Sequence, residues 1–406
     1  MITNDSIIYI ALPVMDELNN ISSFLSCIKR QTDSRYKLIV CVNQPDDYWD
    51  NDNKLSICKN NQSTLQLLSS DDLSIEVIDR SSKGKGWCKK RYGVGWARKV
   101  CMDRANELAQ PDDIIICVDA DTYYPEDYLS SIRQNFIDHP KMLGLAVPYH
   151  HPLCDDEHLN RHILRYEIYM RTYALNMWKI NNPYAYTAVG SSMAVTVKTY
   201  NKIGGITPHK SGEDFYFLQK IKKAGTLGVW NEYKTQPAAR YSDRVFFGTG
   251  PALIKGSNGD WSSYPIYHRD LFKQIKKDFS TFTELYDKLP DQLNEDSLLK
   301  DVFTDIPSIE LLRNNATSKD KFIKACHQKV DGLRILQFLK KYQAQINISD
   351  ELSLKDFFEY YYPELISQYL PIDFSFDHSP IEQLEKLRLF LETEENKHLK
   401  SYHHGI

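Results

Sequence analysis

Residues 114–121 read Ile-Ile-Ile-Cys-Val-Asp-Ala-Asp, an apolar run that ends in two carboxylates one residue apart. The run predicts a buried strand of a parallel sheet. Open α/β sheets bind their ligands at the carboxyl ends of strands, so Asp119 and Asp121 are expected to face a ligand. Neighbouring carboxylates repel unless a cation lies between them, and their oxygens suit Mg²⁺ or Mn²⁺ held with a diphosphate. The alternative is that Asp121 caps a helix beginning near Pro125 while Asp119 faces solvent.

The first half of the chain alternates short β-rich runs with helical patterns, which is typical of a parallel sheet covered by crossover helices. Apolar residues at helical spacing over 21–28 predict the first helix, and residues 156–180 form a longer helical pattern. Strands are expected at 7–12, 36–42, 74–79, 114–119 and 143–148. Around Gly190 the residues become small and β-branched, and the backbone is expected to pass close to a ligand there.

The sequence changes character after about residue 270, where glycine becomes rare and apolar residues recur at helical intervals to Leu399. Its apolar stripes, such as Phe357–Tyr362, are typical packing faces. We therefore predict an α/β domain over residues 1–270 and an all-helical region of unknown role over residues 271–406. The helical region is expected to lack catalytic groups, because its polar residues form no cluster of acid, base and ligand types.

The composition is that of a folded globular protein, with 42% hydrophobic and 26% charged residues in a chain of 406. The formal charge of -4 gives no global basic field, so nucleic acid is not an expected partner. Eight cysteines without a C-x-x-C pair indicate reduced thiols and a cytoplasmic location. The start of the chain lacks the basic region of a signal peptide, and no apolar stretch approaches the ~20 residues of a membrane helix. Peripheral contact with the inner face of a membrane, through the aromatic C-terminal part, stays open.

A second acidic motif, Gly212-Glu213-Asp214-Phe215, follows a Gly-Gly turn and precedes a helical pattern. The helix dipole favours carboxylates at a helix N-terminus, which is a purely structural explanation. The functional alternative is that an ionised carboxylate in this place accepts the proton of an attacking hydroxyl. With a pKa near the ordinary value of about 3.9, Asp214 would be ionised at neutral pH.

Five segments of the sequence follow one another in a particular order. This order is far more specific for one protein family than any single segment. The segments are Ile10–Glu17, Gly93–Lys99, Val118–Asp121, Ala188–Ala194 with Ile203–Gly205, and Glu213–Asp214. Together they resemble the motifs of the inverting glycosyltransferases of family 2, which have the GT-A fold. Asp16 and Lys99 stand where that family usually has Asn. The resemblance covers residues 7–225 and does not extend to the C-terminal helices.

The resemblance implies a metal-dependent inverting enzyme that moves a sugar from a UDP- or GDP-sugar to a hydroxyl of a carbohydrate or lipid-linked acceptor. Assembly of bacterial polysaccharide or glycoconjugate is the usual setting. It implies Mg²⁺ or Mn²⁺ on Asp121 and Asp119, with Asp121 the direct ligand, and Asp214 as general base beside Glu213. The remaining implied contacts are Pro13, Glu17, Asn43, Arg98, Asp119 and Asp121 for the donor, and Gly190 and Ser191 for the acceptor.

Several positions depart from the family pattern or stay open. Asn43 replaces the acidic pair that usually holds the base and ribose, and His268 is one candidate for a third metal ligand. The basic residues of 83–86 and 89–91 either meet donor phosphates or form a solvated charge run. Arg240, Arg244 and Gly248-Thr249-Gly250 either shape an acceptor pocket or lid, or form an ordinary loop.

Two other functions share parts of this pattern. A sugar-1-phosphate nucleotidyltransferase would need a Gly-rich basic loop directly after the first strand, and Leu12-Pro13-Val14-Met15 supplies none. A catalytically silent carbohydrate-binding or nucleotide-sugar-binding protein would not need both acidic motifs, although it could still bind donor.

Overall fold

The computed structural model describes residues 1–88, 91–246, 248–303 and 305–406. The chain divides into two compact units, each built from separate segments. The first unit contains Met1–Ile163, Thr187–Gly259 and Leu399–Ile406, and the second contains Leu164–Tyr186 and Asp260–His398. The predicted division after residue 270 stays a prediction, since compactness does not test whether either part folds alone.

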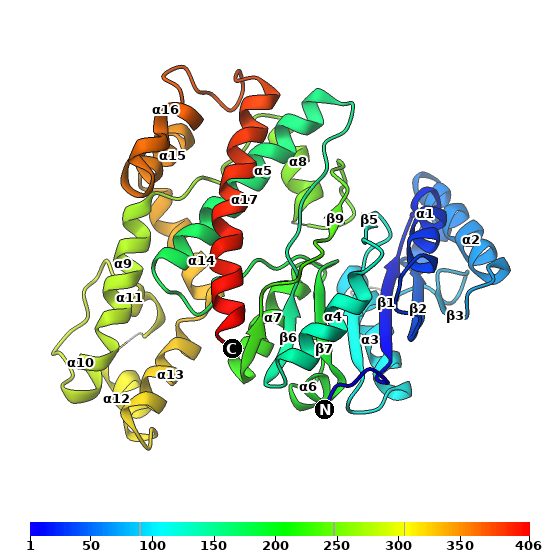
Figure 1. Ribbon diagram of the computed structural model, residues 1–406, viewed down its shortest axis with the longest axis horizontal. Helices are drawn as coiled ribbons and strands as arrows, with labels where there is room; N and C mark the ends of the chain where they lie inside the picture. Colours follow the sequence, from blue (N-terminus) through cyan, green and yellow to red (C-terminus); the bar gives the residue numbers. More distant parts are fainter. Residues whose placement is uncertain (89–90, 247, 304) are drawn as a thin grey trace. The chain divides into compact units, whose positions relative to one another are not determined.

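A seven-stranded sheet forms the centre of the first unit (Figure 1). Its strands are β1 (Ile8–Val14), β2 (Tyr36–Asn43), β3 (Ile75–Arg80), β4 (Ile114–Cys117), β6 (Met142–Ala146), β7 (Met193–Thr196) and β8 (Thr226–Gly228). Their order is β3-β2-β1-β4-β7-β6-β8. Strand β7 pairs antiparallel with β4 and β6, and the other pairings of this sheet are parallel. The expected mostly parallel α/β sheet is confirmed, and the five expected strands lie within two residues of their predicted ends.

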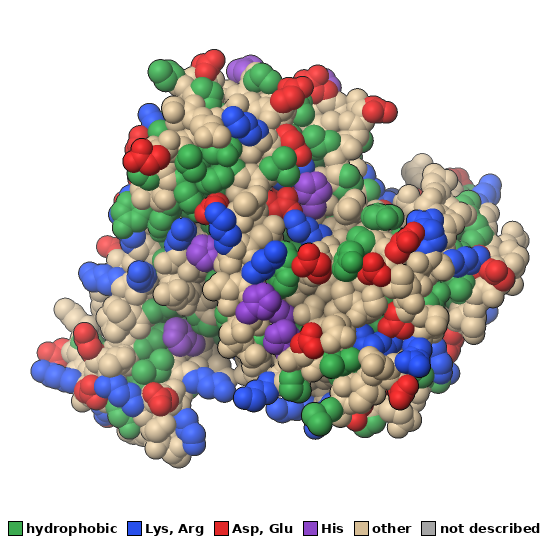
Figure 2. Space-filling model, in the orientation of Figure 1, with side chains coloured by type: hydrophobic (Ala, Val, Ile, Leu, Met, Phe, Trp, Pro, Cys, Tyr) green, Lys and Arg blue, Asp and Glu red, His purple; other side chains and the backbone are tan. Residues whose placement is uncertain are grey.

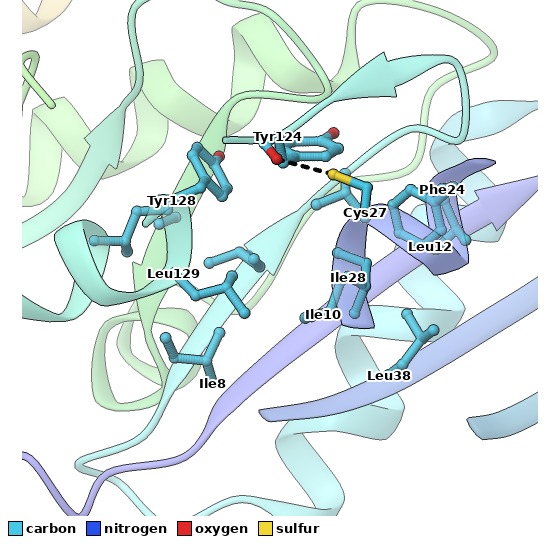
Figure 3. Packing of buried hydrophobic residues seen from close by; sticks show 14 of the residues in the cluster. Ile8, Ile10, Leu12, Phe24, Cys27, Ile28, Leu38, Tyr124, Tyr128 and Leu129 are labelled. Carbon is cyan, nitrogen blue, oxygen red and sulfur yellow. Dashed lines mark hydrogen bonds between the residues drawn. The ribbon is translucent and has the colours of Figure 1, made fainter. Parts of the chain in front are cut away.

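Alternation along the strands divides the core of this unit into two faces. The helices are α1 (Leu18–Lys29), α2 (Leu55–Ser70), α3 (Val94–Leu108), α4 (Tyr128–Asp138), α6 (Val197–Lys202), α7 (Glu213–Ala224) and α8 (Thr249–Ser257). Ile8, Ile10 and Leu12 of β1 belong to one buried cluster with apolar residues of α1 and α4. Figure 3 shows this packing, in which the Cys27 thiol donates to the carbonyl of Tyr124 at 2.8 Å.

The alternate residues of β1 face α3. The Tyr9 hydroxyl donates to the carbonyl of Leu108, and the Cys101 thiol donates to the carbonyl of Leu12. A short two-stranded sheet pairs β5 (Thr122–Tyr123) with β9 (Gln236–Pro237). This small sheet ties the segment after Asp121 to the segment that leads to Arg240.

The region after residue 270 is helical, as predicted. Its elements are α9 (Arg269–Ser280), α10 (Phe282–Asp287), α11 (Leu298–Val302), α12 (Ile306–Asn314), α13 (Lys319–Lys329), α14 (Gly332–Gln343), α15 (Asp350–Tyr361), η3 (Pro363–Leu365), α16 (Ile366–Tyr369) and α17 (Ile381–His404). The second unit also takes in most of α5 (Glu157–Lys179). Within this unit Arg171 pairs with Glu167 and Glu395, and Arg388 pairs with Glu167, all buried.

The last residues of α17 belong to the first unit. The ammonium group of Lys222 in α7 donates to the hydroxyl of Tyr402 at 2.8 Å, and the Nε2 atom of His403 lies 2.8 Å from the amide oxygen of Asn135. Ile406 packs against the buried cluster. Leu399–Ile406 therefore completes a unit whose other segments end at Gly259.

The cysteines, the helices and the surface charges can each be compared with what the composition predicts. All eight cysteines are free, and six of them are buried, including Cys41 and Cys117. Among the described helices, none combines the length and apolarity needed to cross a membrane. On the face shown in Figure 2, acidic and basic side chains are interspersed.

Candidate functional site

The two aspartates of the D-x-D sequence follow β4 directly, at the carboxyl end of the strand. The N–H of Asp119 donates to the Tyr124 hydroxyl at 2.9 Å, and that hydroxyl donates to the carbonyl of Ser191 at 3.2 Å. Tyr124 is fully buried. One tyrosine thus fixes the D-x-D backbone to the Gly190–Ser191 segment, which precedes the antiparallel strand β7.

Arg98 of α3 connects the two acidic motifs. Its Nε donates to Glu213 at 3.0 Å, its Nη1 donates to the carbonyl of Gly190 at 2.8 Å, and its Nη2 donates to Asp119 at 3.2 Å. The Arg98 side chain is 2% exposed and that of Glu213 is 3% exposed. The guanidinium group therefore directs its donors at protein groups from three segments. Its expected contact with the donor stays a prediction.

Asp214 lies in the first turn of α7, after Gly212 at φ 76°. The left-handed backbone at that residue suits glycine and turns the chain into the helix. The Oδ1 atom of Asp214 accepts the N–H of Phe215, while a Cβ placed on Gly190 would lie 3.6 Å from Oδ2. Asp214 and Arg98 thus face the same glycine.

The expected ordinary pKa of Asp214 is wrong. Burial raises the pKa of the Asp214 carboxyl to about 7, and the charge of neighbouring Glu213 adds to the increase. Sequence reasoning missed this because the pattern places the residue at a helix end, whereas its desolvation depends on tertiary packing.

A second arginine holds the other half of the site. The guanidinium of Arg240 donates to both carboxylate oxygens of Glu17, at 2.5 and 3.2 Å, and its Nη2 lies 2.6 Å from Oδ2 of Asp121. Arg244 donates to Glu17 at 2.6 Å and to the carbonyl of Met15 at 2.7 Å. The start of α1 and the end of β4 are therefore joined through side chains of the segment between β9 and α8.

The capping alternative for Asp121 is wrong. The residue before α4 is Asp127, which makes no side-chain capping bond, and Asp121 binds Arg240 instead. Burial raises the pKa of Asp121 to about 7, and the charge of Asp119 adds to this although Arg240 opposes it.

The carboxylates around Arg98 and Arg240 outnumber the guanidinium groups that they contact. Five carboxylates, those of Glu17, Asp119, Asp121, Glu213 and Asp214, meet three guanidinium groups, those of Arg98, Arg240 and Arg244. When all are ionised, two negative charges stay uncompensated, which is the condition that raises the pKa of carboxyl groups. Asp119 and Asp121 offer the hard oxygens that Mg²⁺ and Mn²⁺ prefer.

Pro13 and Asn43, two of the residues expected to contact the sugar donor, lie near the carboxyl ends of β1 and β2. Pro13 lies in β1 opposite Cys41. Asn43 donates to the carbonyl of Val14 at 2.8 Å and accepts the indole N–H of Trp87 at 3.0 Å. Asn43 is buried. Sequence reasoning missed Trp87, since a lone tryptophan beside a glycine-rich stretch gives no motif.

The remaining candidates lie elsewhere or bind neighbouring acids. The Asp46 carboxylate accepts the N–H groups of Gly84 and Gly86, and Lys85 pairs with Asp79. Lys89 and Lys90 lie outside the described residues. His268 belongs to the second unit, where its Nδ1 accepts the N–H of Asp270 at the start of α9, so a metal role for it stays a prediction. The sequence analysis marked Arg240, Arg244, Glu17 and Asp121 but did not predict that these arginines and carboxylates pair.

Comparison with known proteins agrees with these motifs. Residues 114–263 match the model of the Glycosyl transferase family group 2. No curated protein matches the chain. Solved structures that resemble it include TarS 1-349 of S. aureus, at 12% identity and a TM-score of 0.41 over 98% of this chain and 92% of that chain.

Two further likenesses are to glycosyltransferase complexes. One is the mannosyltransferase PcManGT from Pyrobaculum calidifontis with GDP-Man and Mn²⁺, at 13% identity and a TM-score of 0.33 over 97% of this chain and 86% of that chain. The other is GalNAc-T7 with UDP, GalNAc and Mn²⁺, at 11% identity and a TM-score of 0.37 over 90% of this chain and 58% of that chain.

Proposed function

We propose that the chain, which matches the Glycosyl transferase family group 2 over residues 114–263, catalyses a metal-dependent, inverting transfer of a sugar from a nucleotide-diphosphate donor to an acceptor hydroxyl. The observation that carries the proposal is the guanidinium of Arg98. It binds Asp119 of one motif, Glu213 of the other and the carbonyl of Gly190 between them. Residues that the family resemblance assigns to the donor side, to the acidic pair with the base and to the acceptor side therefore contact one buried guanidinium group.

Asp214 is the general base of the proposed reaction. A pKa near 7 suits this role, because a base is most effective when its pKa is close to the working pH. The acceptor hydroxyl attacks the anomeric carbon, the bond from that carbon to the diphosphate oxygen breaks, and the electron pair leaves with the diphosphate. The hydroxyl proton passes to Asp214. One displacement of this kind inverts the anomeric configuration.

Asp121 and Asp119 are the proposed holders of Mg²⁺ or Mn²⁺, with Asp121 the direct ligand. When bound, the cation would offset the charge that develops on the departing diphosphate. Asp119 also accepts a hydrogen bond from Arg98, and this bond holds the Asp119 carboxylate in place. Glu17, Pro13, Asn43 and Arg98 then shape the donor side, and Gly190 with Ser191 shapes the acceptor side.

For the acceptor, we carry over from the family resemblance a carbohydrate or lipid-linked hydroxyl in bacterial polysaccharide or glycoconjugate assembly. The donor base and sugar are best found with a thermal-shift panel of UDP-, GDP- and dTDP-sugars, with and without Mn²⁺. A ligand that binds the folded state raises its stability by mass action. The panel supports the proposal if one donor raises the melting temperature only with the metal.

The decisive experiment is the substitution Asp214→Asn, which keeps the shape and removes the base. We expect donor binding close to that of the unaltered protein and a loss of turnover on the order of 10²–10⁴. The matched control is Asp103→Asn, because Asp103 lies on α3, where it pairs with Lys99 and accepts from Tyr200. Unchanged turnover in Asp214→Asn would exclude this base. Retention of the donor's anomeric configuration in the product, read by nuclear magnetic resonance, would exclude the single displacement.

A further inference from the structure

Arg240 occupies the place beside Asp121 that a metal ion would take. Its Nη2 lies 2.6 Å from Oδ2 of Asp121 and 2.5 Å from Oε1 of Glu17. Because one carboxylate oxygen faces the guanidinium at hydrogen-bonding distance, that oxygen cannot bind a cation in the same arrangement. The carboxylate of Asp121 therefore pairs with a cation of the protein's own, which it shares with Glu17.

The partners of Arg240 are more buried than Arg240 itself. The side chains of Glu17 and Asp121 are 7% and 16% exposed, whereas that of Arg240 is 32% exposed. Glu17 and Asp121 are attached to the sheet, but Arg240 comes from the segment after β9, before α8 begins at Thr249. A guanidinium that is partly in water at the end of a long side chain can leave its partners at low cost.

Arg244 anchors the same segment through partners other than Asp121. It donates to Oε1 of Glu17 at 2.6 Å, to the carbonyl of Met15 at 2.7 Å and to the hydroxyl of Ser242 at 3.1 Å. If Arg240 moved, Glu17 would therefore keep a cationic partner. Arg240 can therefore exchange its partners while Arg244 holds the segment near the site.

We infer that Arg240 is the resident counter-ion of Asp121, which the divalent cation displaces, and that its freed guanidinium then binds the diphosphate of the donor. The inference rests on the proposed metal role of Asp121. A guanidinium suits phosphate oxygens because its planar N–H groups donate two parallel hydrogen bonds. The cation and the diphosphate consequently bind together better than either binds alone.

The test measures Mn²⁺ binding by calorimetry, first with the metal alone and then with UDP or GDP present. In Arg240→Gln the competitor for Asp121 is gone, so we expect Mn²⁺ alone to bind about tenfold more tightly than to the unaltered protein, within the usual range of coupling between sites. At saturating Mn²⁺, the affinity for the nucleoside diphosphate should fall about tenfold. The matched control is Arg104→Gln, whose arginine on α3 pairs with Glu76 and Glu107.

Two further variants separate the possible failures. If Arg240→Gln binds Mn²⁺ alone no better than the unaltered protein, while Asp121→Asn abolishes Mn²⁺ binding, the counter-ion inference is wrong and the metal site stands. If Asp121→Asn leaves Mn²⁺ binding unchanged, the proposed metal site itself is wrong. Arg240→Met, which keeps the apolar stem, replaces Arg240→Gln if thermal melts show that the glutamine variant is poorly folded, and the same expectations apply to it.

Discussion

The two halves of the site are each held by an arginine that pairs with one aspartate of the D-x-D sequence and one glutamate. Arg98 binds Asp119 and Glu213 from inside the core, where its side chain is 2% exposed. Arg240 binds Asp121 and Glu17 from a segment outside the sheet and is 32% exposed. The chemistry of the two pairings is the same, and their burial differs.

The difference in burial between Arg98 and Arg240 determines which of the two ion pairs can open. Breaking a buried ion pair leaves an uncompensated charge in the core, so the Arg98 half is fixed. A partly exposed pair contributes little net free energy, so the Arg240 half can exchange its partner for a ligand. Substitutions of the two arginines test this difference, and the larger loss of stability is expected for Arg98.

Removing the buried arginine should damage the fold most. Arg98→Met leaves the carboxylate of Glu213 buried without its cation, and we expect the free energy of unfolding to fall by about 3–5 kcal/mol in urea titrations. The double variant Arg98→Met/Glu213→Gln, which removes the stranded charge, should recover part of that loss. A loss below about 1 kcal/mol in the single variant would mean that the two arginines do not differ in kind.

The pH dependence of activity tests the buried surroundings of Asp214. Because the base must be ionised, kcat/KM should fall about tenfold per pH unit below a pKa of about 7. The raised pKa also affects stability: between about pH 4 and pH 7 the folded state holds more protons than the unfolded chain, so the free energy of unfolding decreases as pH rises. Asp214→Asn should remove the contribution of this residue to both profiles, while Asp121, whose pKa burial also raises to about 7, keeps its own contribution. An activity limb near pH 4 would contradict the assignment.

The glycine beneath Arg98 gives a smaller test of the fixed half. A Cβ at Gly190 would lie 2.7 Å from Nη2 of Arg98, so Gly190→Ala must displace the guanidinium. Overpacking of this kind costs about 1–3 kcal/mol, measured as a lower urea midpoint. Gly405→Ala is the control, since the nearest atom to its added Cβ is at 3.4 Å. Equal effects of the two substitutions would show that the residues around Arg98 can move to accommodate the added methyl group.

The smallest expected effect belongs to the exchangeable half. Arg240→Gln should change the free energy of unfolding by no more than about 1 kcal/mol, because Arg240 is 32% exposed and Arg244 still pairs with Glu17. The measurement is the same urea titration that is used for Arg98→Met. If the free energy of unfolding fell as much as in the Arg98 variant, Arg240 would be a fixed structural ion-pair partner. That result would argue against its displacement by a ligand.

Local patterns were sufficient to predict the parallel strands and the ends at which the acidic motifs lie. The run before Asp119 is apolar at every position, and the acids before Phe215 stand ahead of a helical pattern, so both signals are contained in a few neighbouring residues. The antiparallel β7 was not foreseen, because the direction in which Met193–Thr196 pairs depends on the path of the chain before it. The pairing of Arg240 with Asp121 has the same cause, since it joins segments far apart in the sequence.

Composition also could not show how the units are assembled. The helical texture after residue 270 marks most of the second unit, but Leu164–Tyr186 belongs to it as well and reads as an ordinary helix of the first half. A change in glycine content and in the spacing of apolar residues indicates only the local structure of a segment. Which unit a helix joins depends on the residues that pack against it.

The placement of Leu399–Ile406 in the first unit has a consequence for biosynthesis. A ribosome makes the sheet early, yet the residues that contact α7 and α4 emerge only after the whole helical region has been translated. Until then Asn135 and Lys222 lack the partners that His403 and Tyr402 provide. The first unit therefore completes its folding only after the helical region has been translated, and a nascent chain interrupted near residue 270 exposes the surface that these residues cover.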